Sequence, residues 1–318
     1  MKPVLVTGAT GFLGRHLVAQ LLDAGFAVRV LCRGQADFPA PVEVVRGDVT
    51  VPADVDRAVQ GVDAVFHLAG MVSRNPADAP LLAQVHVDGT RHVCDAAARS
   101  GVARLVHASS SGTIAISRRP VLHTEDAPYK DDLAVHWPYY RTKIAAEKLA
   151  LSYPFVTVIN PALLLGPGDT RRSSTGDIAA LLNREILSLP TGGLCFVDAR
   201  DTATAAIAAL RQGRPGERYL LGAANWDFAQ LAQAVTELSG VPTPRMKSPT
   251  WLSLLAAPVL RKVMPLLGRR FDIDDATIEM AGCFWYCDSS KARRELDFSP
   301  RDPKETLRDT IRDLRPSA

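Results

Sequence analysis

Short apolar segments alternate with segments of helical periodicity along the first half of the chain. The apolar segments are hydrophobic at nearly every position, which is typical of parallel strands whose two faces are both covered by helices. The intervening segments repeat apolar residues three or four positions apart, as amphipathic helices do. This order predicts repeated βαβ units in a doubly wound parallel sheet, an α/β fold. The predicted strands are residues 4–7, 27–32, 42–45, 64–67, 105–108 and 155–159, and the predicted helices are residues 12–24, 53–59, 80–99 and 138–152.

The pattern becomes looser after residue 160, where glycine and proline clusters divide the sequence into short pieces. We therefore predict a first domain of residues 1–160, to which a segment at about residues 196–222 returns with a helix and short strands. A smaller, mixed α/β lobe that binds the substrate is expected from residues 161–195 and 223–318.

A glycine-rich turn directly follows the first predicted strand and opens the first predicted helix. Its sequence is Thr7-Gly8-Ala9-Thr10-Gly11-Phe12-Leu13-Gly14. Gly8 would allow the tight turn, Gly11 would let the backbone approach a pyrophosphate, and Gly14 would let helix and strand pack closely. Free amides at the helix N-terminus attract the phosphate charge. The turn in its βαβ setting predicts a dinucleotide-binding Rossmann fold.

The end of the second predicted strand bears on which dinucleotide binds. An acidic residue there binds the ribose 2′-hydroxyl of NAD, whereas an arginine accommodates the 2′-phosphate of NADP. Arg33 lies 19 residues after Gly14, and the strand contains no carboxylate. The sequence therefore favours NADP(H), while NAD(H) stays open because Arg33 could be a solvated surface residue. Asp48 and Val49 follow the third strand and are placed for the adenine, with a simple turn aspartate as the alternative.

Tyr139 and Lys143 lie four residues apart at the start of a predicted helix, so their side chains share one face. A phenol ionises near pH ~10, and a fixed ammonium one turn away would stabilise the phenolate and lower that pKa. Ser109, Ser110 and Ser111 end the fifth strand, where open α/β sheets bind ligands. An exposed helical pair and a serine cap are the alternative interpretations. A hydroxyl at the end of this strand can hold a carbonyl oxygen. The glycine turn, the serines and the Tyr/Lys pair also occur together and in the right order along the chain, which favours a catalytic site over these alternatives.

Composition and charge narrow the class of protein. The 318 residues are 47% hydrophobic and 22% charged, which is typical of globular proteins. Basic residues lie in scattered doublets and the net charge is +3, so we expect no nucleic-acid partner. Five separated cysteines without a CxxC pair predict reduced thiols and no metal site. No signal-peptide pattern opens the sequence, and the charges and prolines within residues 251–267 predict a helix packed on the protein. We expect a cytoplasmic protein without a membrane partner.

Taken together, these motifs resemble the extended short-chain dehydrogenase/reductase family, part of the NAD-dependent epimerase/dehydratase superfamily, over nearly the whole chain. Residues 7–14 are similar to the family's TGxxGxxG, residues 67–70 to its HLAA segment, and Tyr139 with Lys143 to its catalytic pair. Other segments are similar to the dihydroflavonol-reductase-like branch, which includes bacterial aldehyde and ketone reductases. One position departs from the family, since His86 stands where asparagine is usual.

The resemblance implies hydride transfer between a nicotinamide and an aldehyde, ketone or secondary alcohol. Tyr139 would supply the proton, and Lys143 would lower the pKa of Tyr139 and hold the nicotinamide ribose. Ser110 would orient the substrate oxygen, with Ser111 as the alternative. A homodimer formed through the helices at residues 80–99 and 138–152 is also implied. The cofactor-binding residues predicted in all are Gly8, Ala9, Thr10, Gly11, Phe12, Leu13, Gly14, Arg33, Asp48, Val49, Leu68, Ala69, Gly70, Tyr139, Lys143 and Pro161.

Two other functions stay open at this point. An epimerase or dehydratase of nucleotide sugars would keep NAD tightly bound and would normally have an acidic residue where Arg33 stands. A redox-sensing protein would keep the fold without the chemistry, but the complete set of Ser110, Tyr139 and Lys143 argues against it. The substrate pocket is expected beside the loop of residues 166–176 and the helix of residues 251–267.

Overall fold

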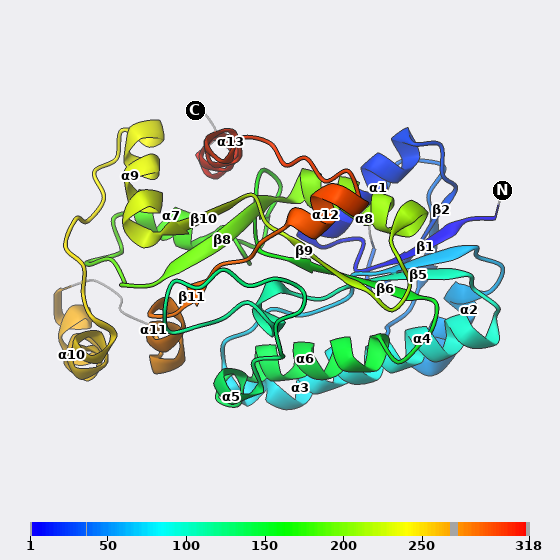
Figure 1. The fold of residues 1–318 in the computed structure, drawn as a ribbon, viewed down its shortest axis with the longest axis horizontal. Helices are drawn as coiled ribbons and strands as arrows, with labels where there is room; N and C mark the ends of the chain where they lie inside the picture. Colours follow the sequence, from blue (N-terminus) through cyan, green and yellow to red (C-terminus); the bar gives the residue numbers. More distant parts are fainter. Residues whose placement is uncertain (1, 36, 268–272, 316–318) are drawn as a thin grey trace.

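A seven-stranded parallel sheet forms the larger part of the protein. The computed structural model describes residues 2–35, 37–267 and 273–315. The strands follow the order β3-β2-β1-β4-β5-β6-β9, so the chain starts inside the sheet and winds outward in both directions (Figure 1). This order confirms the predicted Rossmann fold. The strands are β1 (Val4–Thr7), β2 (Val28–Cys32), β3 (Glu43–Arg46), β4 (Ala64–His67), β5 (Arg104–Ala108), β6 (Val156–Pro161) and β9 (Arg218–Leu221).

The sheet lies between two hydrophobic cores, one on each face. In β1, Val4 and Val6 belong to one core and Leu5 to the other. Because successive side chains point to opposite faces, a strand covered on both sides is apolar at every position. Helices cover both faces, as Figure 1 shows. The first face carries α1 (Phe12–Asp23) and α8 (Ala199–Gln212), and the second carries α2 (Pro52–Val59), α4 (Gly89–Arg99) and α6 (Pro138–Ala150).

The long helix predicted at residues 80–99 is interrupted in its middle. It consists of α3 (Ala79–Ala83), the π-helical turn η2 (Gln84–Asp88) and α4. A π-helical turn inserts an extra residue into the regular spacing, and such turns are frequent at functional sites. The turn contains the buried His86. The regular helical spacing is therefore interrupted around His86, the position where the family usually has asparagine.

A second, smaller sheet is built around β8 (Gly193–Asp198). The strand β10 (Ala224–Asp227) runs antiparallel to β8, while β7 (Leu163–Leu165) and β11 (Phe284–Trp285) pair parallel with different parts of it. A third hydrophobic core joins this sheet to α7 (Gly176–Leu182), α9 (Phe228–Ser239) and α13 (Pro303–Leu314). The remaining helical segments are η1 (Pro76–Asp78), η3 (Ser111–Thr113), α5 (Asp131–Ala134), α11 (Asp275–Ala281) and α12 (Ser290–Glu295).

The segment at residues 196–222 is shared between the two parts. Its first residues belong to β8 in the smaller sheet, whereas α8 packs on α1 and β9 forms an edge of the larger sheet. The expectation that this whole segment returns to the first domain therefore differs from the structure at its strand-like start. The domain boundaries themselves stay a prediction.

A helix forms where residues 251–267 predict one, as α10 (Thr250–Val263) and η4 (Met264–Leu267). The expectation that it packs on the protein holds only for its inner face. Within α10 only Ala257 is fully buried. The side chains of Trp251, Leu255 and Val259 are more than half exposed. No helix within the described ranges is long and apolar enough to cross a membrane.

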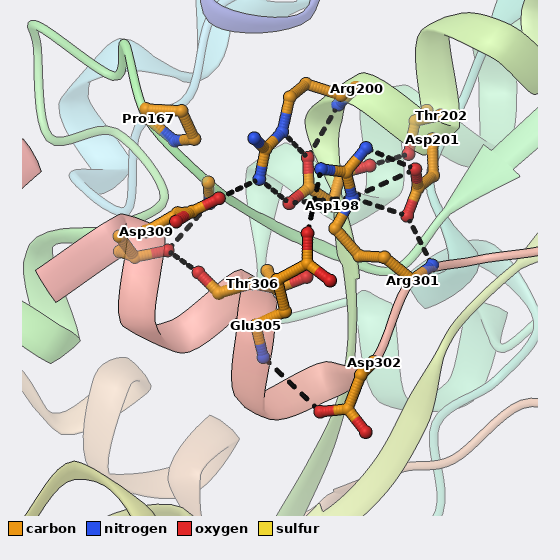
Figure 2. Close-up of polar contacts among 12 residues, drawn as sticks. Pro167, Asp198, Arg200, Asp201, Thr202, Arg301, Asp302, Glu305, Thr306 and Asp309 are labelled. Carbon is orange, nitrogen blue, oxygen red and sulfur yellow. Dashed lines mark hydrogen bonds and ion pairs between the residues drawn. The ribbon is translucent and has the colours of Figure 1, made fainter. Parts of the chain in front are cut away.

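An ion-pair network fixes α13 against β8 and α8. Asp198, fully buried at the end of β8, accepts hydrogen bonds from Nε of Arg200 at 2.9 Å and from Nη2 of Arg200 at 2.8 Å. Arg200 also pairs with Asp309 of α13 at 2.7 Å, and Arg301 pairs with Asp201 at 2.8 Å. Figure 2 shows the two guanidinium groups among these carboxylates. The network joins the C-terminal helix α13 to β8, the strand around which the smaller sheet is built.

We expect Asp198→Ala to lower the free energy of unfolding by about 3 kcal/mol at neutral pH, because two partly buried guanidinium groups lose an acceptor. Burial alone would raise the pKa of Asp198, but hydrogen bonds from Arg200 and the charges of Arg200 and Arg301 outweigh burial and hold it below its ordinary value. A carboxylate whose pKa is lowered by folding stabilises the protein above its unfolded pKa of about 3.9. That stabilisation is lost as the pH falls through the folded pKa.

The difference in unfolding free energy between the wild type and Asp198→Ala should therefore shrink below about pH 4. Urea unfolding at neutral pH and at pH ~3 measures this difference. Asp63→Ala is the matched control, because Asp63 forms an exposed pair with Lys2 and should change stability little. A difference that stays constant over this pH range would contradict the assignment.

Candidate active site

A cavity of about 950 Å³ crosses the carboxyl ends of the central strands and continues into the smaller lobe. Open α/β sheets bind ligands at this edge. The cavity brings together Ser110, Tyr139 and Lys143 with all predicted cofactor residues except Ala9, which is fully buried in the core beneath the glycine turn. The other predicted cofactor residues on its wall are Gly8, Thr10, Gly11, Phe12, Leu13, Gly14, Arg33, Asp48, Val49, Leu68, Ala69, Gly70 and Pro161.

The glycine turn has a shape that fits a bound pyrophosphate. Gly8 has a φ of +72° and lies so close to Leu68 that a Cβ would be 2.6 Å from the Leu68 carbonyl carbon. A Cβ on Gly14 would likewise collide with the backbone of Gly8 and Ala9. Helix α1 begins at Phe12 without a side-chain cap or an acidic residue in its first turn. Its first amides therefore lack acceptors within the helix and are suited to an anion.

Arg33 and Asp48 lie beside each other after β2 and β3. Nε of Arg33 is 3.9 Å from Oδ2 of Asp48, and the Arg33 side chain is 73% exposed. The other oxygen of Asp48 accepts hydrogen bonds from the N–H and the hydroxyl of Thr50, both at 2.9 Å. Asp48 is thus fixed by its own turn. The guanidinium of Arg33 is accessible from the cavity, and the nearby carboxylate offsets part of its charge.

The three serines after β5 have different surroundings. The Ser109 hydroxyl donates to the buried carboxylate of Glu147 and is therefore occupied. Oγ of Ser110 accepts the N–H of Gly112 at 3.2 Å, and this side chain is partly exposed on the cavity wall. Ser111 is only 5% exposed. Since Oγ of Ser110 acts as an acceptor toward Gly112, its own hydrogen can be directed at a ligand oxygen.

Tyr139 and Lys143 occupy the first two turns of α6, whose start is favoured by Pro138 at the first helical position. Both residues line the cavity. The buried Lys143 donates from Nζ to the carbonyl oxygen of Ala108 at 2.7 Å. Among the residues that the structure describes, no hydrogen bond joins Lys143 to the hydroxyl of Tyr139. The helix therefore brings the pair to the same site, and the ammonium is anchored on the end of β5.

The pKa of Tyr139 differs from the sequence prediction. Burial of the ring raises the pKa of Tyr139 to about 12, so the net change is opposite to the lowering that the sequence predicted. Burial also lowers the pKa of Lys143 to about 8, although the carboxylate of Glu147 acts in the opposite direction. The sequence placed the ammonium near the phenol but did not show how completely both would be removed from water. Near neutral pH the phenol is protonated and the ammonium is largely charged.

His86 connects the loop after β4 to helix α6. Its Nε2 accepts the N–H of Met71 at 3.1 Å. The hydroxyl of Thr142 donates to backbone carbonyls of its own helix, so Nδ1–H of His86 donates to this hydroxyl at 2.8 Å. Burial and, to a smaller extent, the charge of Lys143 lower the pKa of His86 to about 3. The neutral ring packs edge-on against Tyr139, with centroids 5.6 Å apart.

Glu147 is a second residue whose role the sequence did not reveal. Its fully buried carboxylate accepts hydrogen bonds from Ser109, from Oγ1 of Thr113 at 2.8 Å and from Nδ2 of Asn160 at 2.7 Å. Arg218 of β9 pairs with its other oxygen at 3.4 Å. These contacts tie α6 to the ends of β5, β6 and β9. The only sequence signal was the spacing of four residues between Lys143 and Glu147.

His67 and His107 are buried next to each other in the core of the larger sheet. His67 bonds the hydroxyls of Thr7 at 2.8 Å and Thr90 at 3.0 Å, and burial lowers its pKa to about 3. Burial likewise lowers the pKa of His107, whose ring lies 5.3 Å from that of His67. Within the described part of the chain, no group of three or more His, Cys, Asp or Glu side chains is arranged to hold a metal ion.

The end of the cavity in the smaller lobe is mainly apolar. Helices α7, α9, α10 and α11 all contribute to it, as does the loop of residues 166–176 through Gly168 and the residues that follow. Asp169 shapes this loop by accepting hydrogen bonds from Ser173, Ser174 and Thr175. The large apolar side chains on this wall include Leu181, Ile186, Leu187, Leu189, Leu194, Phe228, Leu231, Leu260, Ile273, Ile278, Met280 and Trp285.

Few charged groups line this apolar end. Arg74, from the loop after β4, lies 3.8 Å from Asp177 of α7, so this pair bridges the two parts of the protein. Arg171 is a second cation on the wall, whereas Asp169, Asp177 and Glu185 are acidic. Acidic side chains therefore outnumber basic side chains at this end of the cavity. An anionic group on a ligand would find little compensation here.

Comparison with known proteins agrees with this geometry. Residues 4–222 match the NAD dependent epimerase/dehydratase family. Sterol demethylase protein B of Methylococcus capsulatus is 33% identical over 322 residues, which cover 96% of each chain. The 3 beta-hydroxysteroid dehydrogenase/Delta 5→4-isomerase of Mycobacterium tuberculosis is 28% identical over 93% of this chain and 86% of its own. The solved structure of gox2253 has a TM-score of 0.86 at 27% identity, covering 99% of this chain and 98% of that one.

The match over residues 4–222 includes the glycine turn, the serines and the Tyr/Lys pair that meet in the cavity. The Rossmann sheet and the turn provide a site for a nicotinamide dinucleotide. The chain therefore belongs to the NAD-dependent epimerase/dehydratase family and is an enzyme of the extended short-chain dehydrogenase/reductase type.

Proposed function

We propose that the protein is an NADP(H)-dependent oxidoreductase that interconverts an apolar aldehyde or ketone and the corresponding alcohol. The observation that carries this proposal is the single cavity on which Ser110, Tyr139 and Lys143 lie between the glycine turn and an apolar end. A dinucleotide on the turn and an apolar substrate in the smaller lobe would meet at these three side chains. Homodimerisation through α3, α4 and α6 and a cytoplasmic location stay predictions.

The residues around the turn fit the cofactor. The amides at the start of α1 would bind the pyrophosphate, Asp48 and Val49 would contact the adenosine, and Arg33 would bind a 2′-phosphate. Leu68 to Gly70, Pro161 and Lys143 would contact the nicotinamide half. When bound, the nicotinamide group would supply or accept the hydride.

The protein's own residues account for the proton. With a pKa of about 12, Tyr139 is protonated near neutral pH and is ready to donate to a carbonyl oxygen. Ser110 would donate a hydrogen bond to the same oxygen and fix its position. The phenolate left on Tyr139 would be stabilised by the charged Lys143, which is held by the Ala108 carbonyl. This set of protonation states favours the reduction of a carbonyl.

The apolar end supports a reductase over the alternative of a nucleotide-sugar epimerase or dehydratase. A nucleoside diphosphate carries negative charge, whereas at this end Arg74 is paired with Asp177 and the two cations Arg74 and Arg171 face the three carboxylates of Asp169, Asp177 and Glu185. The two relatives are named for a sterol and a hydroxysteroid, which are apolar polycyclic compounds. The epimerase alternative is favoured by the family's own name and by the similarity to a solved nucleoside-diphosphate-sugar epimerase of Pseudomonas aeruginosa, which has a TM-score of 0.79 at 25% identity over 99% of this chain and 97% of that one. We regard a non-catalytic dinucleotide sensor as the third candidate.

The pKa of Lys143 gives a prediction for the pH dependence of carbonyl reduction. Folding lowers this pKa to about 8, so the ammonium is charged below that pH and loses its proton above it. We expect kcat/KM for reduction to be level below about pH 7 and to fall above about pH 8. Lys143→Arg keeps a positive charge and should move the fall to higher pH, even at a reduced rate. An alkaline limb that stays in place in this variant would contradict the role of Lys143.

The two cavity serines can be distinguished by mutation. We expect Ser110→Ala to lower the single-turnover rate of reduction by about 10²-fold, because a donor to the developing oxyanion is removed. Ser111→Ala is the matched control and should change the rate little, because Ser111 also lines the cavity but the contact with the substrate oxygen is assigned to Ser110. A larger loss in Ser111→Ala would show that the adjacent serine orients the substrate.

Two measurements test the proposal against its alternatives. Nucleotide released on denaturing the purified protein is identified by chromatography, and NADPH oxidation is followed with apolar aldehydes and ketones. We expect that no stoichiometric NAD is released from the protein. We also expect that apolar aldehydes and ketones cause net oxidation of NADPH. Stoichiometric NAD, together with turnover of nucleotide sugars without net redox change, would support the epimerase. Binding of NADPH without oxidation by any carbonyl in the panel would support the sensor.

A further inference from the structure

The outward side of α10 is an exposed apolar surface. Trp251, Leu255 and Val259 are spaced four residues apart and are 67%, 69% and 61% exposed. Met246 before the helix and Leu266 after it are 69% and 83% exposed. We call these five residues the α10 face. Eight of the sixteen strongly exposed large apolar side chains in the described ranges lie between residues 246 and 273. Such a concentration of exposed apolar side chains in one segment, three of them on one side of a helix, is typical of an interaction site.

Two exposed cations without an acidic partner in the described ranges flank the α10 face. In the described segment of residues 241–267 the sequence contains four lysines and arginines and no aspartate or glutamate, and Asp274 and Asp275 follow at the start of α11. Lys247 and Arg261 pair with Asp227 and Asp275. Arg245 and Lys262 are exposed, and neither has an ion-pair partner among the residues that the structure describes. An apolar helix side flanked by cations complements the surface of a bilayer with anionic lipids.

The opposite side of the same helix lines the cavity. Ser253, Ala256 and Leu260 are on the cavity wall. Figure 1 shows α10 at the outer edge of the smaller lobe, away from the large sheet. One helix of 14 residues therefore separates the apolar end of the cavity from the exposed apolar surface. An apolar molecule that moves from the exposed surface into the cavity would therefore meet apolar side chains on both sides of α10.

We propose that the α10 face binds the surface of an anionic phospholipid bilayer, so that an apolar substrate passes from the bilayer into the cavity. The helix would lie in the interface, with Trp251 at the level of the headgroups and Leu255 and Val259 among the upper acyl chains. The proposal of membrane binding is argued from the α10 face and the cations beside it, and it does not depend on the catalytic activity. Only the delivery of a substrate rests on the proposed function.

Flotation with vesicles tests the binding without any substrate. The full chain is mixed with vesicles of phosphatidylcholine alone or of phosphatidylcholine with phosphatidylglycerol, and the bound fraction is measured. We expect binding to the anionic vesicles that weakens with salt. The double variant Leu255→Glu/Val259→Glu should reduce the partition coefficient about tenfold or more. Val121→Glu/Leu122→Glu, which adds the same charges at another exposed apolar site, is the matched control and should change it less than about twofold.

A spectroscopic measurement locates the contact. Lipids with brominated acyl chains quench tryptophans that enter the bilayer, so they should quench part of the wild-type fluorescence. Trp251→Phe should abolish this quenching and keep most of the binding, which also separates insertion from a folding defect. Equal vesicle binding by the Leu255→Glu/Val259→Glu variant and the wild type would overturn the proposal. Wild-type protein that ignores vesicles but self-associates through this face would overturn it in favour of a second copy as the occupant.

The outcome is independent of the catalytic proposal. Reduction of a small, water-soluble carbonyl should be the same in the wild type and in Leu255→Glu/Val259→Glu, because neither residue lines the cavity. Loss of vesicle binding with unchanged reduction supports the membrane role. Vesicle binding by a protein that reduces no carbonyl would leave this surface assigned and would remove the reductase proposal alone.

Discussion

Replacing Tyr139 by phenylalanine is expected to lower kcat for carbonyl reduction by about 10²- to 10⁴-fold, the usual value of a general acid. The change removes the phenol that donates the proton, but it keeps the ring that packs edge-on against His86 and Tyr140. Cofactor affinity should therefore be nearly unchanged. Stopped-flow single turnovers measure the chemical step, and fluorescence titration measures cofactor binding.

Tyr140→Phe provides the matched control for Tyr139→Phe. Tyr140 is adjacent in the same helix turn, lines the same cavity and stacks on Trp285 at 4.9 Å, yet it is not assigned the proton. Its variant should keep most of the rate. Retained turnover in Tyr139→Phe with an authentic substrate would rule out Tyr139 as the acid. Equal losses in both variants would point to a packing effect.

Replacing Arg33 by alanine is expected to remove most of a preference for NADPH over NADH. A charge-assisted contact with the 2′-phosphate contributes about 1.5–3 kcal/mol. This corresponds to a preference of about tenfold to a hundredfold. The position of Arg33 3.9 Å from Asp48 favours the lower end of that range. The preference should be larger at low salt, because an exposed contact is screened.

Titration of both cofactors by fluorescence measures this effect. In Arg33→Ala the affinity for NADPH should fall, while the affinity for NADH should change little. Arg57→Ala is a suitable control, because this exposed arginine pairs with Asp54 and does not line the cavity. Equal affinities of the wild type for NADPH and NADH would defeat the NADP assignment and favour an epimerase-type enzyme.

The large sheet could be predicted because its signal is local. The inner strands are apolar at most positions, and the turn from residues 7 to 14 joins strand to helix within a few residues. The meeting of Ser110, Tyr139 and Lys143 followed from the rule that parallel strands end at one edge of the sheet. These features depend on spacing and topology and on few long-range contacts.

The remaining parts of the site depend on contacts between distant residues. Glu147 is joined to Arg218 across 71 positions, and His86 to Thr142 across 56. The pKa of Tyr139 depends on burial, which the sequence did not show, and its direction was predicted wrongly for that reason. The helix α10 is apolar on two sides, so its pattern could not tell the cavity side from the exposed side.

The central claim is that hydride passes between a nicotinamide cofactor and a carbonyl carbon of an apolar substrate. The most direct test is a single turnover with NADPH deuterated at the transferable position of the nicotinamide and an apolar ketone, followed by mass spectrometry of the product. We predict one deuterium on the carbinol carbon for each NADPH oxidised, with loss of transfer in Tyr139→Phe. Deuterium that stays on the cofactor while nucleotide sugars are converted would contradict the claim.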